Sequence, residues 1–256
     1  MNSHEENHEL GIFNNPAIKQ VVGQFEISMR VANKVKANWH NQECSFLCGT
    51  DGELRDGIGT SGYIIYSEYD EDPLIEGHVA EHQPNETASS TRQELLGQLA
   101  IEYWLEHIKE IFGEPISQLK VTIVTDSRAN ILILNRTLHK IGLKDVMKPD
   151  IDIALAILHQ RKLTPWVEYL TKKVKSHINK EDAPNESHWI ANYHADRLAT
   201  EAQNKVLQKE MIARHPCILP GMIVGCFIDS KLVHSNLKKS NYTSSACIPI
   251  TNVSEE

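Results

Sequence analysis

The chain has 256 residues, of which 41% are hydrophobic and 23% are charged, and its formal net charge at pH 7 is −8. This composition excludes a fibrous or disordered protein, and the length allows one full-sized core with residues left over, or two small domains. The acidic balance argues at first against nucleic acid as a partner, because binding to phosphates usually requires positive charge.

The N-terminus and the cysteines narrow the class of protein further. Residues 1–9 are polar and acidic with no apolar stretch behind them, and no segment approaches the roughly 20 apolar residues that span a bilayer. We therefore expect a soluble, intracellular chain without a membrane partner, in the cytoplasm or the nucleus. The five cysteines include no Cys-x-x-Cys pair, which argues against a disulfide framework and against a ribbon-type zinc site.

The first half of the chain contains three kinds of pattern. Residues 1–42 form a polar leader with a weakly amphipathic helix at about Ala17–Trp39, which we expect to be an N-terminal extension. From Ser45 onward, short apolar runs separated by glycines predict a three-stranded antiparallel meander. Residues Thr91–Phe112 then predict a long helix, with Ser89 or Ser90 as its N-cap and Gly113 after its end.

The second half alternates strands with helices. The predicted elements are a strand at Lys120–Thr125, helices at Ser127–Leu138 and Pro149–His159, a strand at Trp166–Lys175 and a helix at His188–Ile212. This order predicts an α/β fold, a five-stranded mixed sheet of three antiparallel and then two parallel strands flanked by helices. We expect the domain to span 43–213, and 214–256 to be a C-terminal extension with a hairpin near Ile218–Val233 and a disordered end.

Three acidic residues interrupt this hydrophobic pattern. Asp51 ends the first meander strand, Asp126 ends the strand after the long helix, and Glu94 opens the buried stripe of that helix. Asp51 has an ordinary interpretation as a turn former and Asp126 as a helix cap, but a buried carboxylate such as Glu94 must be paired, protonated or bound to metal. The two strands are natural central neighbours, so the carboxylates should meet. Mg²⁺ or Mn²⁺ is the economical way to join them.

The ordered set of motifs resembles type 1 ribonuclease H. The motifs are Thr50-Asp51-Gly52, Thr91-Arg92-Gln93-Glu94, Val124-Thr125-Asp126-Ser127, Val174-Lys175-Ser176-His177 and Asn192-x-x-x-Asp196-x-Leu198-Ala199. Order and structural context match across about Glu43–Ala213. The interval from His177 to Asp196 is longer than in cellular members and is similar to that in ribonuclease H domains of eukaryotic retroelement reverse transcriptase polyproteins.

The resemblance implies an endonuclease that hydrolyses the RNA strand of RNA–DNA hybrids with two Mg²⁺ ions, for which Mn²⁺ is a possible substitute. It implies that Asp51 bridges both ions, that Asp196 holds the ion that activates water, and that Glu94 and Asp126 hold the other. His177 would act in proton transfer or product release, and a solvated loop histidine is the alternative interpretation. Candidate substrate-binding residues are Gly52, Glu53, Thr91, Arg92, Gln93 and Asn130. Upstream reverse transcriptase segments are a further expected partner.

Two other functions remain open at this point. A related integrase or resolvase also uses clustered carboxylates, although integrases place their glutamate on a late helix. A catalytically silent scaffold domain would have no reason to retain all four acids.

The net charge is unevenly distributed along the sequence, because residues 140–180 carry a local charge of +5. Cellular bacterial members of the family that this chain resembles carry an extra basic helix and loop that binds the hybrid. Here Lys140, Lys144 and Lys148 lie in a short connection, so we expect that protrusion to be reduced. We also expect the isolated domain to bind hybrid weakly.

Overall fold

The computed structural model describes residues 11–40, 44–83, 89–135, 150–175, 178–217, 219–220, 224–228, 231–233 and 246–249. His177, Lys140, Lys144 and Lys148 lie outside these residues.

A mixed sheet of six strands forms the centre of the fold, in the order β1-β4-β3-β2-β5-β6. The strands span Gln24–Ile27 (β1), Ser45–Arg55 (β2), Ile58–Ser67 (β3), Pro73–His82 (β4), Leu119–Thr125 (β5) and Val167–Lys173 (β6). β2, β3 and β4 pair antiparallel, whereas β5 lies parallel to both β2 and β6. The predicted α/β fold with a mixed sheet is confirmed. The predicted number of five strands is wrong, because β1 from the N-terminal segment pairs with β4.

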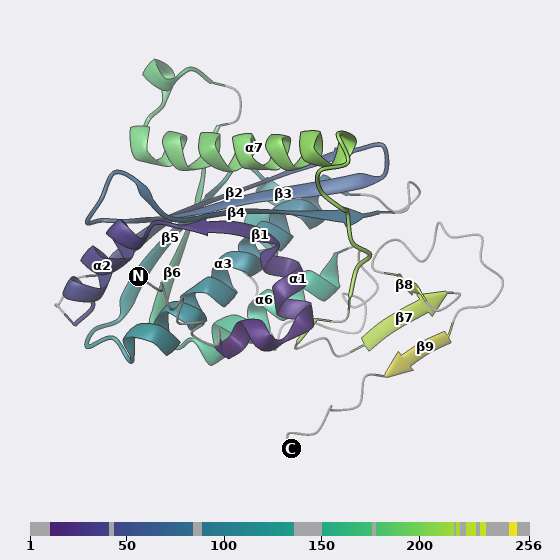
Figure 1. Ribbon diagram of the computed structural model, residues 1–256, viewed down its shortest axis with the longest axis horizontal. Helices are drawn as coiled ribbons and strands as arrows, with labels where there is room; N and C mark the ends of the chain where they lie inside the picture. Colours follow the sequence, from purple (N-terminus) through teal and green to yellow (C-terminus); the bar gives the residue numbers. More distant parts are fainter. Residues whose placement is uncertain are drawn as a thin grey trace, which may run out of the picture.

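Helices cover both faces of the sheet (Figure 1). α7 (Glu186–Leu207) lies across β2, β3 and β4 on one face, and α3 (Ser90–Phe112) lies across β2 and β3 on the other. α6 (Ile151–Leu163) packs against α3, and α4 (Arg128–Leu134) follows β5. α3 is buried along most of its length, because the sheet, α1 (Pro16–Val22) and α6 pack around it. A short 3-10 helix, η3 (Lys180–Asp182), precedes α7.

The N-terminal segment contains two helices with a strand between them. After the 3-10 helix η1 (Gly11–Asn14), α1 (Pro16–Val22) ends at Gly23, and α2 (Met29–Asn38) follows β1. The prediction of a single helix at Ala17–Trp39 is therefore wrong at its centre, where β1 separates the two helices. Gly23 has a φ of 69°, and a Cβ at this position would lie 2.3 Å from the His78 carbonyl oxygen. Glycine thus allows the chain to leave α1 and to pair directly with β4.

This segment contributes to the same hydrophobic core as the central sheet. Phe13, Val21, Val31 and Trp39 are all buried in that core. The Trp39 indole N–H also donates a hydrogen bond to the Gly113 carbonyl oxygen, at 2.9 Å, which ties α2 to the end of α3. Residues assigned to an extension by their sequence are therefore packed as part of the domain.

The chain after α7 returns to the edge of β4. The Arg214 amide donates to the Ala80 carbonyl oxygen at 3.0 Å, and the His82 amide donates to the Arg214 carbonyl oxygen at 2.8 Å. Leu219 lies in the main core with 4% exposure. Further along, β7 (Val224–Ile228) pairs antiparallel with β8 (Lys231–Val233) and with β9 (Ala246–Pro249). β7 and β8 lie within the hairpin-like stretch predicted from the sequence.

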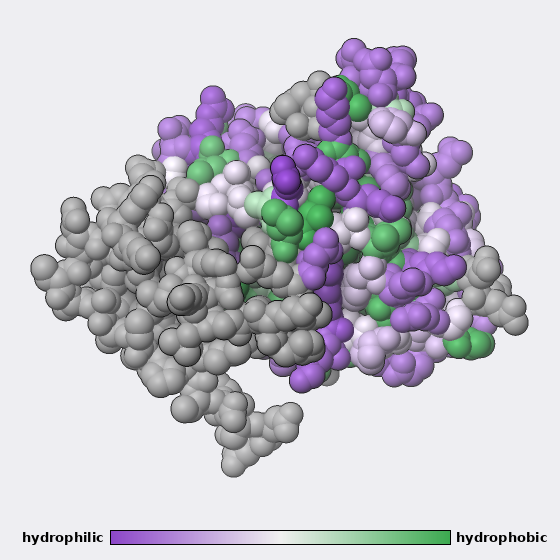
Figure 2. Space-filling model, turned by 180° about the vertical axis from the view of Figure 1, so that it is seen from behind, coloured by the Kyte–Doolittle hydropathy of each residue, from purple (hydrophilic) through white to green (hydrophobic). Residues whose placement is uncertain are grey.

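The rear face is mainly hydrophilic over the described residues (Figure 2). Figure 2 shows that hydrophobic residues on the rear face are interspersed with hydrophilic ones. Within the described part of the chain, no helix combines the length and the apolar character that a bilayer crossing requires. Cys44, Cys48 and Cys217 are free thiols, and the side chains of Cys226 and Cys247 lie outside the described residues.

Candidate active site

Asp51 and Asp126 meet where two parallel strands diverge. β2 and β5 remain paired up to Gly49 and Val124, and each acidic residue follows two positions later on its own strand path. β2 continues beyond this point with β3 alone, and Asp51 faces Gly62 in that ladder. The carboxyl ends of parallel strands lie at the same edge of a sheet, so the divergence leaves room for both side chains.

Close packing of α3 against β2 brings Glu94 to the same place. The Thr50 hydroxyl donates to the Glu94 carbonyl oxygen at 3.0 Å, which fixes the first turn of α3 over the strand. A Cβ at Gly52 would lie 2.6 Å from the Glu94 amide nitrogen, so this approach requires glycine at position 52. The Asn130 side-chain amide donates to Glu94 Oε2 at 2.9 Å and orients the carboxylate.

Asp196 lies on α7, the helix that covers the opposite face of the sheet from α3. A Cβ at Gly62, the cross-strand neighbour of Asp51, would lie 2.1 Å from the Ala195 carbonyl oxygen of α7. α7 therefore rests almost directly on this part of β3. Asp196 is exposed, and its charge is one of those that raise the pKa of Asp51.

The three inner carboxylates form one compact cluster. One ligand oxygen from each of Asp51, Glu94 and Asp126 lies within 4.8 Å of the other two. Burial, followed by repulsion from Asp126, raises the pKa of Asp51 to about 7. Burial also raises the pKa of Glu94 to about 8, although a hydrogen bond from Ser127 opposes this rise. Ionising these acids together is costly, because their charges are buried and repel one another. A divalent cation would offset both costs.

Comparison with known proteins gives structural similarity alone. No family model and no curated protein matches the sequence. The ribonuclease H1 of the halophilic archaeon Halobacterium salinarum is similar, with 17% identity and a TM-score of 0.41 over 63% of this chain and 98% of that chain. A ribonuclease H1 isolated from compost has 18% identity and a TM-score of 0.45 over 64% and 98%. The foamy viral protease-reverse transcriptase in complex with RNA/DNA hybrid has 12% identity and a TM-score of 0.38 over 62% and 20%. The function proposed below therefore rests on the residues of this chain.

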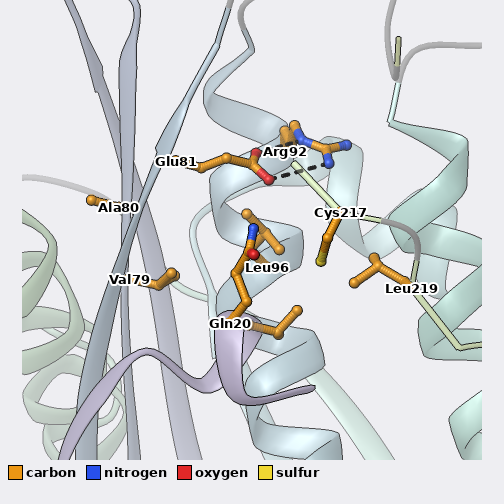
Figure 3. A pocket seen from close by; sticks show the side chains of 9 residues that line it. Gln20, Val79, Ala80, Glu81, Arg92, Leu96, Cys217 and Leu219 are labelled. Carbon is orange, nitrogen blue, oxygen red and sulfur yellow. Dashed lines mark hydrogen bonds and ion pairs between the residues drawn. The ribbon is translucent and has the colours of Figure 1, made fainter. Parts of the chain in front are cut away.

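The position of Arg92 does not suit its predicted role in substrate binding. Its side chain is 1% exposed and lies between Glu81 and Asp152, with a guanidinium nitrogen 2.8 Å from Asp152 Oδ2. Figure 3 shows its contact with Glu81, in which Nε lies 2.7 Å from Glu81 Oε2. A guanidinium that is buried and bound to two carboxylates is unavailable to a nucleic acid. Arg92 instead joins β4, α3 and α6.

Two further predicted substrate contacts are also buried. Gln93 has 0% exposure and lies 3.5 Å from Glu81, and Asn130 has 1% exposure and binds Glu94. Neither side chain is available to a nucleic acid, and Asn130 instead positions a metal-ligand candidate. Gly52 and Glu53 follow Asp51 on β2, and Thr91 lies one turn before Glu94 on α3; all three are half-buried and remain candidates for substrate contact.

Two hydroxyl residues that sequence reasoning did not select support Glu94. Ser127 and Thr125 both form hydrogen bonds to the Glu94 carboxyl group that lower its pKa. The Thr125 hydroxyl also accepts a hydrogen bond from the Ser127 amide at 3.1 Å, which shapes the turn that carries Asp126. Their position in Val124-Thr125-Asp126-Ser127 was a usable signal, because short hydroxyl side chains beside a buried acid commonly satisfy its oxygens.

Proposed function

We propose that this chain is an endoribonuclease that hydrolyses the RNA strand of RNA–DNA hybrids with divalent metal ions. The observation that carries the proposal is the cluster of Asp51, Glu94 and Asp126, whose ligand oxygens lie within 4.8 Å of one another at the divergence of β2 and β5. Asp196 lies near enough to raise the pKa of Asp51. The three clustered acids come from β2, α3 and the turn after β5, and Asp196 comes from α7.

The donor set fits Mg²⁺ or Mn²⁺. All the candidate ligands are carboxylate oxygens, the hard donors that these cations prefer, and no described cysteine or histidine belongs to the cluster. We propose that Asp51 is shared between two ions, that Glu94 and Asp126 hold one of them, and that Asp196 helps to hold the other. When bound, two such ions supply an activated water and neutralise charge on the leaving oxygen.

Hydrogen bonds from neighbouring residues orient two of these carboxylates. The Gly52 amide donates to Asp51 Oδ1 at 2.7 Å, and Asn130 donates to Glu94 Oε2 at 2.9 Å. Each of these contacts uses one oxygen of the carboxylate. Burial limits the water that would otherwise screen the charges at this point. We propose that His177 transfers a proton or assists product release.

The substrate proposal follows from the chemistry around the cluster. An RNA–DNA hybrid presents ribose 2′-hydroxyl groups along its minor groove, and we propose that the half-buried residues Gly52, Glu53 and Thr91 contact such groups.

We further propose that the chain originates from a retroelement, in which upstream reverse transcriptase segments would be its partners. The placement of Glu94 on the first long helix supports this function over an integrase or resolvase.

A cleavage assay with labelled hybrid tests the proposal. Wild-type protein should cut the RNA strand when Mg²⁺ or Mn²⁺ is present and should leave it intact with EDTA. Asp51→Asn should abolish cutting, whereas the exposed control Asp182→Asn should retain it. A silent scaffold would leave the hybrid intact in every sample, and an integrase-like enzyme would act on DNA duplexes instead. Either result would reject the proposed function.

A further inference from the structure

A cavity of about 420 Å³ opens directly beside the carboxylate cluster. Asp126 forms part of its wall, Lys173 at the end of β6 and Lys175 after it form another part, and the start of α7 contributes His188 and Trp189. Its volume lies in the range of about 300–1,000 Å³ that is typical of ligand pockets. Because Asp126 belongs to both the cavity and the cluster, an occupant would lie next to the proposed point of hydrolysis.

Trp189 is held as a rigid wall of this cavity. Its indole N–H donates to the Ile178 carbonyl oxygen at 3.0 Å. Its ring stacks on Tyr193, with centroids 4.9 Å apart and planes 9° apart. Residues 189, 193 and 196 follow the spacing that places side chains on one helical face, so the aromatic pair and Asp196 share a side of α7.

The two lysines give the cavity positive charge that the described structure leaves unneutralised. Lys173 and Lys175 are both exposed, and no ion pair to either is found among the described carboxylates. The Val174 amide between them donates to the Thr125 carbonyl oxygen at 3.0 Å, which keeps the segment beside the strand that leads to Asp126. Burial and the charge of Lys172 lower the pKa of His188, which favours its neutral form.

We propose that this cavity binds the sugar-phosphate backbone of the cut strand, at the nucleotide next to the scissile phosphate. Lys173 and Lys175 would pair with its phosphodiester, and Trp189 would pack against its ribose. The bases of a hybrid are paired with the other strand, so the indole meets the sugar and not the base. Lysine contacts to phosphate position a nucleic acid without reading its sequence. This inference rests on the proposed function and assigns a substrate-positioning subsite to it.

Steady-state kinetics on an RNA–DNA hybrid test the inference. Lys173→Gln/Lys175→Gln should raise KM about tenfold and leave kcat within about twofold, because the lysines hold the strand without touching the reacting atoms. Each lost phosphate contact should also reduce the slope of log KM against log salt by about 0.9 between roughly 50 and 200 mM KCl. Trp189→Ala should raise KM, and Trp189→Phe should restore most of the affinity.

Lys120→Gln/Lys162→Gln provides a matched control. It removes the same charge from two exposed lysines on β5 and α6, outside the cavity, and should leave KM and the salt slope nearly unchanged. Melting temperatures of both double variants should match wild type, since all four side chains are exposed.

The outcomes separate the subsite from the function. If wild type cuts hybrid but the cavity variant has the KM and salt slope of the control, the subsite is wrong and the nuclease function stands. Equal losses in the two double variants would also overturn the subsite, because they would indicate general charge attraction. If wild type does not cut hybrid at all, both proposals fail.

Discussion

Replacement of Arg92 by methionine should destabilise the protein severely. Arg92 is buried with Glu81 and Asp152, at 1%, 5% and 6% exposure. Methionine keeps the apolar volume but leaves two buried carboxylates facing each other without a cation. Asp150 lies close enough for Arg92 to lower its pKa, yet burial still raises that pKa to about 6.

The expected loss is about 4–5 kcal/mol at neutral pH. Removing one partner of a buried ion pair costs about 3–5 kcal/mol, and here one guanidinium serves two carboxylates, which favours the upper part of that range. A domain is stabilised by only about 5–15 kcal/mol in total. For a chain of this size each kcal/mol shifts the melting temperature by about 2–4 °C, so a fall of roughly 8–20 °C is expected.

The loss should shrink as the pH falls. Burial raises the pKa of Glu81 and that of Asp150 above their unfolded values, so each carboxyl favours the folded state when it is protonated. That contribution is complete below the unfolded pKa and is lost as the pH rises through the folded pKa. Without Arg92 these folded pKa values rise further. The deficit should therefore be larger at about pH 7.5 than at about pH 5.

Urea denaturation of Arg92→Met at both pH values measures this effect. Arg30→Met is a matched control, because Arg30 also pairs with two carboxylates, Asp70 and Asp72, but its side chain is 53% exposed. Exposed pairs of this kind contribute little to stability, because water screens them. If Arg92→Met melts like wild type and changes only KM, Arg92 contacts substrate and the buried network has been misjudged.

Three other perturbations test the site and the core. Mg²⁺ at ten times its dissociation constant should stabilise wild type by about 1.4 kcal/mol. In Asp51→Asn this Mg²⁺-dependent rise in melting temperature should vanish, while the metal-free variant should melt no lower than wild type; an unchanged rise would place the metal elsewhere. Gly62→Val should reduce kcat at least tenfold, because a Cβ there would lie 2.1 Å from the Ala195 carbonyl oxygen and displace Asp196. Normal turnover by this variant would show that the position of α7 is not critical. Trp39→Ala should cost about 3–5 kcal/mol in denaturation experiments, since Trp39 is 1% exposed; a loss below about 1 kcal/mol would mean that α2 is dispensable.

The central strands and the carboxylate cluster were predictable because local patterns determine them. The apolar runs predict β2 to β6, and the order of strands and helices predicts which strands are neighbours. Asp51 then lies where β2 leaves β5, close to Asp126 at the end of β5, and helical periodicity turns Glu94 toward them. Each inference requires only the spacing of apolar residues within one element and the rules of strand connection.

Interactions between distant segments account for what was not predicted. The apolar residues of 17–39 fit a helix, and only the close approach of Gly23 to His78 on β4 explains why the helix is interrupted. Arg92 resembles a surface residue beside Glu94 because its partners, Glu81 and Asp152, lie 11 and 60 residues away in sequence. Such contacts leave no periodic signal in the sequence.

The outer edge of β4 has a consequence for synthesis of the chain. β1 covers residues 75–78 of this edge, and Arg214 covers the part near Ala80 and His82. A strand edge with free amide and carbonyl groups can pair with another chain and start aggregation. During translation, residues 80–82 therefore lack their native cover until residue 214 has left the ribosome, more than 130 residues later. Nascent chains halted before that point should be the form most in need of a chaperone.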